Sequence, residues 1–369
     1  MSVISSQSLI YLALSYFVAI SVTPVMVRIA TRKGWVDQPG LRKVHLSPIP
    51  RLGGVGIFLA IWLAWFLFRD SQPLVLDPAP FRAFETLFGA SALIFLLGIY
   101  DDIRGANAWQ KLAVQFVAAA WVVSQGLQIK LVLNPFGGEE LAVSSAALSW
   151  TLSLFWIVLV TNAINLIDGL DGLASGVCAI TALSIFFISS EFGSLHIPVF
   201  AMCVAGACLG FLMFNFSPAR IFLGDSGSLV LGFLLACLSL MGSTKRSTAI
   251  VMFGPPLILL LPLADTFMAI GRRFLRRVVL GEASAPAGGR SLVSRLKEVL
   301  QADQEHIHHG LLKIGLSHRS AVILLYAITT VLGISAYRVA VGNHLVGTFA
   351  VIGLLSLALY GLRRAAKRS

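Results

Sequence analysis

The amino-acid sequence predicts an all-α polytopic membrane protein with about eleven transmembrane helices. Hydrophobic residues make up 57% of the 369-residue chain and charged residues only 12%, and the mean hydropathy is +0.85. Soluble globular chains carry about 25% charged residues. Apolar runs recur along the whole chain, with roughly the 20 residues that a helix needs to cross a bilayer. We therefore expect one integral membrane domain, residues 1–369.

Each apolar run predicts one membrane-spanning helix. No Lys or Arg precedes the first run, so it lacks the basic start of a secretory signal and is counted as a span. Short polar stretches rich in turn-forming residues separate the later runs. The predicted spans are residues 8–29, 52–68, 83–100, 112–127, 148–160, 173–189, 197–214, 228–241, 250–270, 321–340 and 345–362.

The distribution of charge orients these spans. With the N-terminus outside and the C-terminus in the cytoplasm, 22 of the 28 Lys and Arg residues fall in cytoplasmic segments, as the positive-inside rule predicts. The net charge of +11 would also suit nucleic-acid binding. The basic residues, however, lie in short loops between apolar runs, which fits orientation and contact with lipid headgroups. We expect no nucleic-acid partner.

Two connections are more than short loops. Residues 128–145 contain two β-prone stretches, 129–133 and 140–143, around the turn-forming sequence Asn-Pro-Phe-Gly-Gly. This pattern predicts a small external β-hairpin. Residues 271–319 are the longest polar region, and we expect them to form a long cytoplasmic loop.

The sequence TNAINLIDGLDG at residues 161–172 places two amides and two carboxylates where an apolar run meets water. Asp168 and Asp171 are three residues apart, so a helix continuing through them would present both on one face. Carboxylates at a membrane boundary are costly unless they are paired, hydrated or bound to a metal. The motif indicates either a cation and phosphate site or a polar loop that caps two helices.

Two further acidic motifs lie on the same predicted side of the membrane. GIYDDIRG (98–105) closes a span with Asp101 and Asp102, whose mutual repulsion a divalent cation would relieve. In NFSPARIFLGDSGSLVLG (215–232), two glycines bracket Asp225, and such a loop can hold Mg²⁺ while its N–H groups meet phosphate oxygens. The plainer alternatives are an acidic pair at a helix end and a turn that starts a helix with Asp225 near its N-cap.

A histidine cluster follows in HIHHGLL (306–312), with His306, His308 and His309. The spacing does not match the HExxH zinc pattern. Imidazoles that face a diphosphate are one interpretation, and a surface or adventitious metal site is the other.

On the predicted topology all of these motifs reach the cytoplasmic side. Carboxylates for a divalent cation, turn-rich loops and cationic groups are the parts that phosphoryl transfer at a membrane surface needs. A transporter would instead place its acids near the bilayer midplane and show repeated broken helices. Only Asp265 sits well inside a predicted span, so the residues favour the transferase.

The four motifs, in the chain order GIYDDIRG, TNAINLIDGLDG, NFSPARIFLGDSGSLVLG and HIHHGLL, resemble those of the polyprenyl-phosphate N-acetylhexosamine-1-phosphate transferase family, within the glycosyltransferase 4 and MraY-like superfamily. The likeness runs from about residue 34 to about residue 320 and is greatest with the WecA and TagO branch. It implies transfer of GlcNAc-1-phosphate from UDP-GlcNAc to undecaprenyl phosphate, with Mg²⁺ or Mn²⁺, at the cytoplasmic face of the bacterial inner membrane. The products would be GlcNAc-diphospho-undecaprenol and UMP. Membrane lipids would surround the enzyme, and a homodimer is one assembly that the resemblance allows.

The resemblance also implies roles for particular residues. Asp101 matches the residue proposed to accept the proton of the lipid phosphate. The expected catalytic residues are Asp101, Asp102, Asp168 and Asp171. The expected metal ligands are Asp225 and Asn165. The expected substrate-binding residues are Lys43, His45, Lys111, Asn215, Phe222, His306, His308 and His309.

The identity of the donor stays open. Another UDP-HexNAc, such as a GalNAc, QuiNAc or FucNAc derivative or the MurNAc-pentapeptide, would use the same chemistry. In the MurNAc-pentapeptide branch three consecutive histidines precede an acid, whereas Ile307 interrupts the histidines here. Residues 278–303 are longer than expected for the GlcNAc branch, so we expect sugar selectivity to lie in the surrounding loop. Direct attack is our working mechanism, with a covalent aspartyl-phosphate as its alternative.

Overall fold

A computed structural model of the chain describes residues 6–39, 47–71, 79–129, 131–133, 140–142, 145–192, 196–241, 311–312 and 315–342. The helices bounded within these ranges are α1 (Ser6–Lys33), α2 (Gly53–Ser71), α3 (Ala79–Arg104), α4 (Ala108–Ser124), α5 (Ala146–Ile167), α6 (Leu173–Glu191), α7 (His196–Asn215), α8 (Asp225–Met241) and α13 (His318–Gly342). The strands are β1 (Val36–Asp37), β2 (Ile49–Pro50), β3 (Leu131–Leu133) and β4 (Glu140–Ala142).

Nine of the predicted spans each coincide with one of these helices. The other two, residues 250–270 and 345–362, lie outside the described residues. Six described helices are long and apolar enough to cross a membrane, and α2 and α8 are shorter apolar helices. The chain thus has the helices of a polytopic membrane protein, while the number of eleven spans and their orientation stay predictions.

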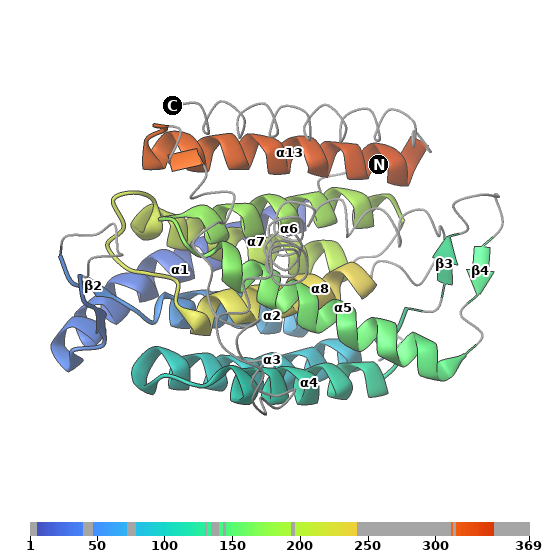
Figure 1. Ribbon diagram of the computed structural model, residues 1–369. Coiled ribbons are helices and arrows are strands. Elements are labelled where there is room, and N and C mark those ends of the chain that lie inside the picture. Colours follow the sequence, from blue (N-terminus) through green and yellow to red (C-terminus); the bar gives the residue numbers. More distant parts are fainter. Residues whose placement is uncertain are drawn as a thin grey trace, which may run out of the picture.

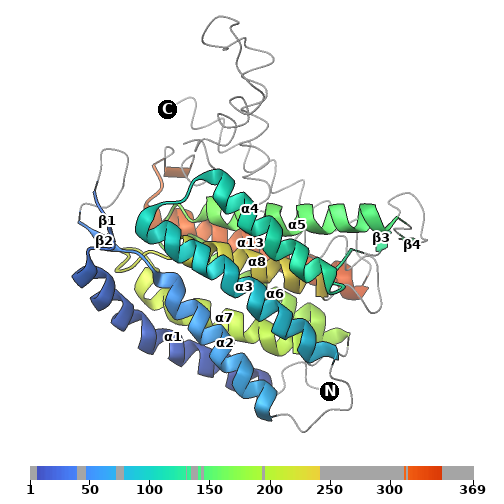
Figure 2. The same cartoon turned by 90° about the horizontal axis from the view of Figure 1, so that it is seen from below.

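Helix α8 lies at the centre of the bundle (Figures 1 and 2). It packs against α2, α3, α5, α6 and α7, and every residue from 226 to 240 is buried. A helix that is apolar all round needs such enclosure. Helices α3 and α4 lie on one side of this centre, and α13 lies on the other, against α6 (Figure 1).

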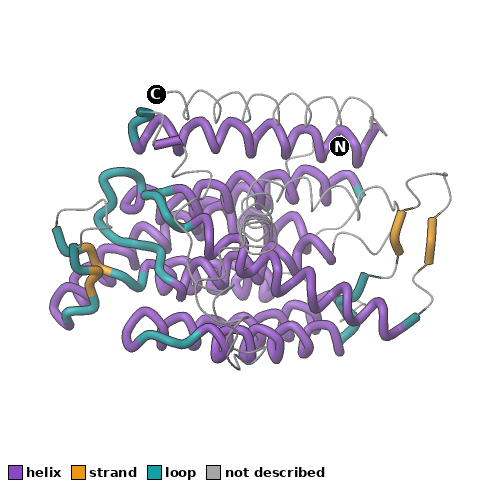
Figure 3. The backbone as a smooth tube through the Cα atoms, in the orientation of Figure 1, coloured by secondary structure: helices purple, strands orange, loops and turns teal. Residues whose placement is uncertain are grey.

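The two pairs of strands lie at opposite ends of the bundle (Figure 3). Strands β3 and β4 pair antiparallel, with Val132 opposite Leu141, in the segment where the sequence predicts a hairpin. Their placement outside the membrane stays a prediction. Strands β1 and β2 lie at the other end, beside the loop that joins α7 to α8.

Strand β2 and the start of α2 hold that α7–α8 loop through backbone hydrogen bonds. The Phe222 N–H donates to the Pro50 carbonyl at 2.8 Å, and the Gly53 N–H donates to the Phe222 carbonyl at 3.0 Å. The Gly54 N–H donates to the Leu223 carbonyl at 2.9 Å. Backbone hydrogen bonds to β2 and to the first residues of α2 therefore hold the loop that leads into α8 in place.

Candidate active site

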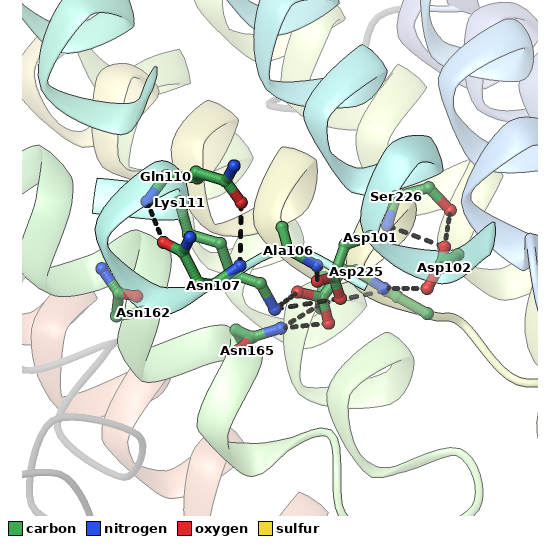
Figure 4. A network of polar contacts seen from close by, with 12 residues as sticks. Asp101, Asp102, Ala106, Asn107, Gln110, Lys111, Asn162, Asn165, Asp225 and Ser226 are labelled. Carbon is green, nitrogen blue, oxygen red and sulfur yellow. Dashed lines mark hydrogen bonds and ion pairs between the residues drawn. The ribbon is translucent and has the colours of Figure 1, made fainter. Parts of the chain in front are cut away.

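Three carboxylates meet where α3 ends and α8 begins (Figure 4). Asp101 and Asp102 lie in the last turn of α3, and Asp225 is the first residue of α8. One oxygen of each lies within 4.8 Å of an oxygen of the others. The sequence places the acidic pair after a span and Asp225 in a loop; the structure extends both helices, so all three side chains are attached to helix ends.

Lys111 joins this cluster from the first turn of α4. Its Nζ lies 2.5 Å from Oδ2 of Asp225 and 2.9 Å from Oδ2 of Asp101. The Lys111 side chain is 24% exposed and the two carboxylates are 15% and 19% exposed, so the three charges are only partly hydrated. Lys111 therefore offsets the repulsion between two carboxylates that come from different helices.

The turn between α3 and α4 fixes the position of Lys111. The Ala106 N–H donates to Oδ1 of Asp101 at 2.6 Å. Asn107 and Gln110 form a capping box, in which each side chain accepts a hydrogen bond from the other's backbone N–H. Such a box starts a helix at a defined residue, and here it starts α4 three residues before Lys111.

Asn165 approaches the cluster from the last turn of α5. Its Nδ2 donates to Oδ1 of Asp225 at 3.0 Å and to Oγ of Ser228 at 2.8 Å. Asp225 thus has a partner on each oxygen, Asn165 on one and Lys111 on the other. The sequence predicts Asn165 and Asp225 as metal ligands, and the structure brings them into contact.

Asp102 differs from its neighbour in its surroundings. It is only 8% exposed, and both of its carboxylate oxygens accept hydrogen bonds from the first residues of α8. The sequence groups Asp102 with the catalytic residues, and that role stays a prediction; in the structure its oxygens accept the N–H groups of Asp225 and Ser226.

Asp168 and Asp171 do not share a helix face, because α5 ends at Ile167 and Asp168 is its C-cap. Among the described residues the Asp168 carboxyl has no hydrogen-bond partner. Loss of hydration, followed by the negative charges of Asp225, Asp102 and Asp171, raises the pKa of Asp168 to about 8.

Asp171 holds two loops together. Its Oδ2 accepts a hydrogen bond from the Ala219 N–H at 3.0 Å, which ties the α5–α6 turn to the α7–α8 loop. From α13, Nε of Arg319 donates to the Ser217 carbonyl of the same loop at 2.9 Å. The catalytic role that the sequence predicts for Asp171 stays a prediction, and its described contact is with the loop that leads to Asp225.

Asn215 and Phe222 both belong to this loop or its start. Asn215 is 2% exposed; its Nδ2 donates to the Ile221 carbonyl, and its Oδ1 accepts from Oγ of Ser175. Phe222 is half-buried and uses its backbone to bind β2 and α2. Contact of either side chain with a substrate stays a prediction.

Five predicted substrate-binding residues lie outside the described residues, so the structure does not place them. They are Lys43, His45, His306, His308 and His309.

Two glycines that the sequence analysis did not single out allow the cluster to form. A Cβ on Gly98 of α3 would lie 2.4 Å from Cα of Ser226, and a Cβ on Gly54 of α2 would lie 2.1 Å from the backbone nitrogen of Gly227. Real Cβ atoms do not approach backbone so closely, so α2 and α3 can touch the first turn of α8 only because these positions are glycine. Gly98 is the first residue of the motif GIYDDIRG, but the motif does not indicate its contact with Ser226.

A pair of amides, also missed, links α4 to α5. Nδ2 of Asn162 donates to Oε1 of Gln115 at 2.6 Å, and Nε2 of Gln115 lies 3.4 Å from Oδ1 of Asn162. Gln115 is one turn after Lys111, and Asn162 is about one turn before Asn165. The pair therefore joins the two helices that bring Lys111 and Asn165 to Asp225.

The fold and the site define a class: a polytopic helical membrane protein with a carboxylate and lysine cluster at one end of its bundle. The sequence model of the family described as "Glycosyl transferase family 4" matches residues 84–243, which include all of the described site from Asp101 to Asp225. Relatives along most of the chain agree with this match, and the chain belongs to glycosyl transferase family 4.

Three relatives illustrate the relationship. A "Probable undecaprenyl-phosphate N-acetylglucosaminyl 1-phosphate transferase" of Bacillus subtilis is 37% identical over 325 residues, which is 87% of this chain and 82% of the relative. A "Decaprenyl-phosphate N-acetylglucosaminephosphotransferase" of Mycobacterium tuberculosis is 36% identical over 317 residues, 81% of this chain and 74% of the relative. A "Phospho-N-acetylmuramoyl-pentapeptide-transferase" of Mycolicibacterium gilvum is 32% identical over 284 residues, 66% of this chain and 79% of the relative.

Proposed function

We propose that this protein transfers GlcNAc-1-phosphate from UDP-GlcNAc to undecaprenyl phosphate, giving GlcNAc-diphospho-undecaprenol and UMP. The observation that carries the proposal is the convergence of Asp101, Lys111 and Asp225 at one end of a bundle of apolar helices. A lipid phosphate reaches a membrane enzyme at such an end, and a diphosphate donor needs cationic groups there. The names of the Bacillus and Mycobacterium relatives support the same chemistry.

The residues fit a divalent cation. Mg²⁺ is held in proteins by carboxylate, carbonyl and water oxygens, and the carboxylate cluster offers the first kind. The Asn165 carbonyl oxygen offers the second, since only Nδ2 of this amide is hydrogen-bonded among the described residues. We expect Asp225 and Asn165 to hold Mg²⁺ or Mn²⁺ beside Asp101. The cation, when bound, would neutralise charge on the diphosphate and on the departing UMP.

Asp101 and Lys111 are the residues that would meet the lipid phosphate. Oδ1 of Asp101 is held by the Ala106 N–H, while Oδ2 faces Lys111 and is the oxygen that would accept the phosphate proton. Lys111 would then pair with the phosphate itself. The lipid phosphate oxygen forms a bond to the β-phosphorus of UDP-GlcNAc. The bond from the β-phosphorus to the bridging oxygen breaks, and its electron pair leaves with UMP.

This reaction exchanges one phosphoanhydride for another, so positioning and charge neutralisation are the main tasks of the protein. The described contacts serve these tasks. Asp225 is held on both oxygens, by Asn165 and by Lys111, and the loop before it is bound to β2 and α2.

The donor is the finer part of the proposal. The phospho-N-acetylmuramoyl-pentapeptide relative has lower identity and shares a shorter part of this chain than the two GlcNAc relatives. This difference favours UDP-GlcNAc. The other UDP-HexNAc donors and the MurNAc-pentapeptide donor are the alternatives that the assay must include.

A donor assay tests the proposal. Purified protein in detergent is mixed with undecaprenyl phosphate, Mg²⁺ and each UDP-sugar in turn, and UMP release is followed. We expect UMP from UDP-GlcNAc only when lipid phosphate is present, and none in EDTA. UMP from a different donor alone would keep the mechanism and replace the sugar. Folded protein that releases no UMP from any donor would overturn the transferase and favour a carrier.

Glu85 provides a matched control for Asp101. Both carboxylates are on α3, but Glu85 is near the opposite end of the helix, where it pairs with Arg69 at 2.9 Å and is 47% exposed. Asp101→Asn should abolish most of the UMP release, whereas Glu85→Gln should leave it unchanged. Equal activity of the two variants would remove Asp101 from the mechanism.

We also propose that the site faces the cytoplasm of a bacterial inner membrane. The positive-inside distribution of the basic residues supports this orientation. Cysteines introduced at Arg104 and at Ser145, near opposite ends of the bundle, can be labelled with an impermeant thiol reagent in intact cells. Labelling at Ser145 only is expected, and labelling at Arg104 only would reverse the orientation.

A further inference from the structure

The first turn of α8 has no cap of its own. A helix begins with backbone N–H groups that have no partner within the helix, and the residue before the first turn normally supplies a side-chain oxygen. In α8 that residue is Gly224, whose carbonyl accepts the N–H of Ser228 at 3.0 Å and which has no side chain. Its φ of +70° is also a conformation that favours glycine.

Asp102 supplies the missing oxygens from α3. Its Oδ1 accepts the Asp225 N–H at 2.8 Å. Its Oδ2 accepts the Ser226 N–H at 3.1 Å and the Ser226 hydroxyl at 2.6 Å. A Cβ on Gly224 would lie 2.5 Å from Oδ2 of Asp102. The place of a normal capping side chain is therefore filled by a residue more than 120 positions earlier in the chain.

The approach of α3 to α8 is specific to this turn. Gly98 lies one turn before Asp102 and therefore on the same face of α3, and its missing side chain admits Ser226. The carboxylate also meets the positive end of the α8 dipole, where a negative charge is stabilised. Hydrogen bonding and steric fit thus agree on one partner for Asp102.

We propose that Asp102 is a positioning residue, the N-cap of α8 supplied from α3, and that it acts by aiming Asp225 at Lys111 and Asn165. It neither ligates the cation nor exchanges a proton with the substrate. The capping follows from the contacts alone, and its consequence for turnover rests on the proposed transferase activity.

A double-mutant cycle in EDTA tests the capping. Asp102→Asn, Ser226→Ala and the double variant are compared with the wild type by thermal unfolding in detergent. Each single change should lower the unfolding temperature by a few degrees, and the double variant should lose less than the sum because the two residues share a hydrogen bond. Ser239→Ala, near the far end of α8, is the matched control. Its effect on the unfolding temperature should add to that of Asp102→Asn.

Binding of Mn²⁺ without substrate, followed by electron paramagnetic resonance, separates positioning from ligation. The Ser226 hydroxyl donates to Asp102 and is not proposed as a ligand of the cation. If Asp102 positions Asp225, Ser226→Ala should nevertheless weaken Mn²⁺ binding several-fold, as Asp102→Asn does. A ligand role for Asp102 predicts another pattern: Asp102→Asn loses Mn²⁺ affinity, Ser226→Ala does not, and the unfolding temperature in EDTA is unchanged or higher. That pattern would overturn the proposal.

Ser226→Ala alone keeps the test decisive if Asp102→Asn does not fold, because it removes one hydrogen bond and leaves every carboxylate in place. Unaltered unfolding and unaltered Mn²⁺ affinity in Ser226→Ala would also overturn the proposal. Neither readout needs turnover, so an inactive wild type would refute the proposed function without deciding the role of Asp102.

Discussion

The two ends of the helical bundle are held together by different interactions. At the site end, α8 is fixed by the carboxylate of Asp102 and by close backbone contacts at two glycines. Toward the other end, aromatic rings fill the space: Trp65 of α2 lies 4.1 Å from Phe84 of α3 and 5.3 Å from Phe200 of α7, centroid to centroid. Hydrogen bonds at the site end fix the orientation of individual polar groups. The aromatic end contributes apolar packing, which other side chains of similar volume could also supply.

This difference implies that the two ends respond differently to mutation. A change at the site end should alter substrate binding and turnover more than stability, because the charged groups of the site belong to a few side chains. A change at the aromatic end should alter stability and leave the site intact. Variants at the two ends of the bundle test that division.

Asp225→Ala should reduce turnover most. It removes the residue on which α4, α5 and α8 converge, and loss of one such electrostatic group costs about 10²–10³-fold in rate. UMP release at saturating UDP-GlcNAc measures the effect, with circular dichroism to show that helix content is retained. A variant with more than a tenth of wild-type turnover would contradict the role of Asp225.

Trp65→Ala should have the largest effect on stability. Trp65 is 1% exposed, and removal of a buried aromatic ring costs about 3–5 kcal/mol in protein cores. Thermal unfolding in detergent measures the loss. At a temperature where the variant is folded, its KM for UDP-GlcNAc should equal that of the wild type, and a raised KM would show that the two ends are coupled.

Gly98→Ala should affect both stability and turnover. The added methyl group would collide with backbone at Ser226, and such overpacking costs about 1–3 kcal/mol. Gly89→Ala is the matched control on the same helix, because its Cβ would meet the Trp121 side chain, 2.5 Å away, instead of backbone. We expect both variants to unfold earlier, but only Gly98→Ala to lose turnover. Equal turnover would show that the α3–α8 contact does not set the site.

Gln115→Leu should have a smaller effect. Gln115 is 1% exposed, and its loss leaves the Asn162 side chain without its partner on α4, which costs about 1–3 kcal/mol. The double variant Gln115→Leu/Asn162→Leu removes both amides and should regain part of that stability. If the double variant is the least stable of the three, the pair does not act as a unit.

The smallest expected effect is a change in the pH dependence of stability. The pKa of Asp168 in the folded protein is raised to about 8, above the value of about 3.9 for an unfolded chain. The stabilisation that its bound proton gives is therefore full at low pH and is lost as the pH rises toward 8. Since Asp168 keeps part of its surface exposed, we expect a modest slope. In EDTA, Asp168→Asn should unfold at a temperature that depends less on pH between 5 and 8, and parallel curves for the two proteins would contradict the assignment.

Sequence and structure contributed different parts of the site. The motifs predicted that Asp101 and Asp225 lie on the same side of the membrane, and the structure places their carboxylates close together; their roles stay predictions. Lys111, expected in substrate binding, lies between these two carboxylates. Gly54, Gly98 and the amide pair were not predicted, because a glycine or an amide in an apolar run has no local pattern that names its partner.

Composition and the lengths of the apolar runs were sufficient to determine the membrane class and the described helices, because hydrophobicity and span length are properties of continuous segments. Motif residues also determined which chemistry to expect. Only the tertiary structure decided which groups each carboxylate contacts. Asp101 and Asp102 are adjacent and chemically identical, yet one faces Lys111 and the other caps α8. That distinction depends on which helix packs against each side of α3, a contact between residues 124 positions apart, and no local pattern carries it.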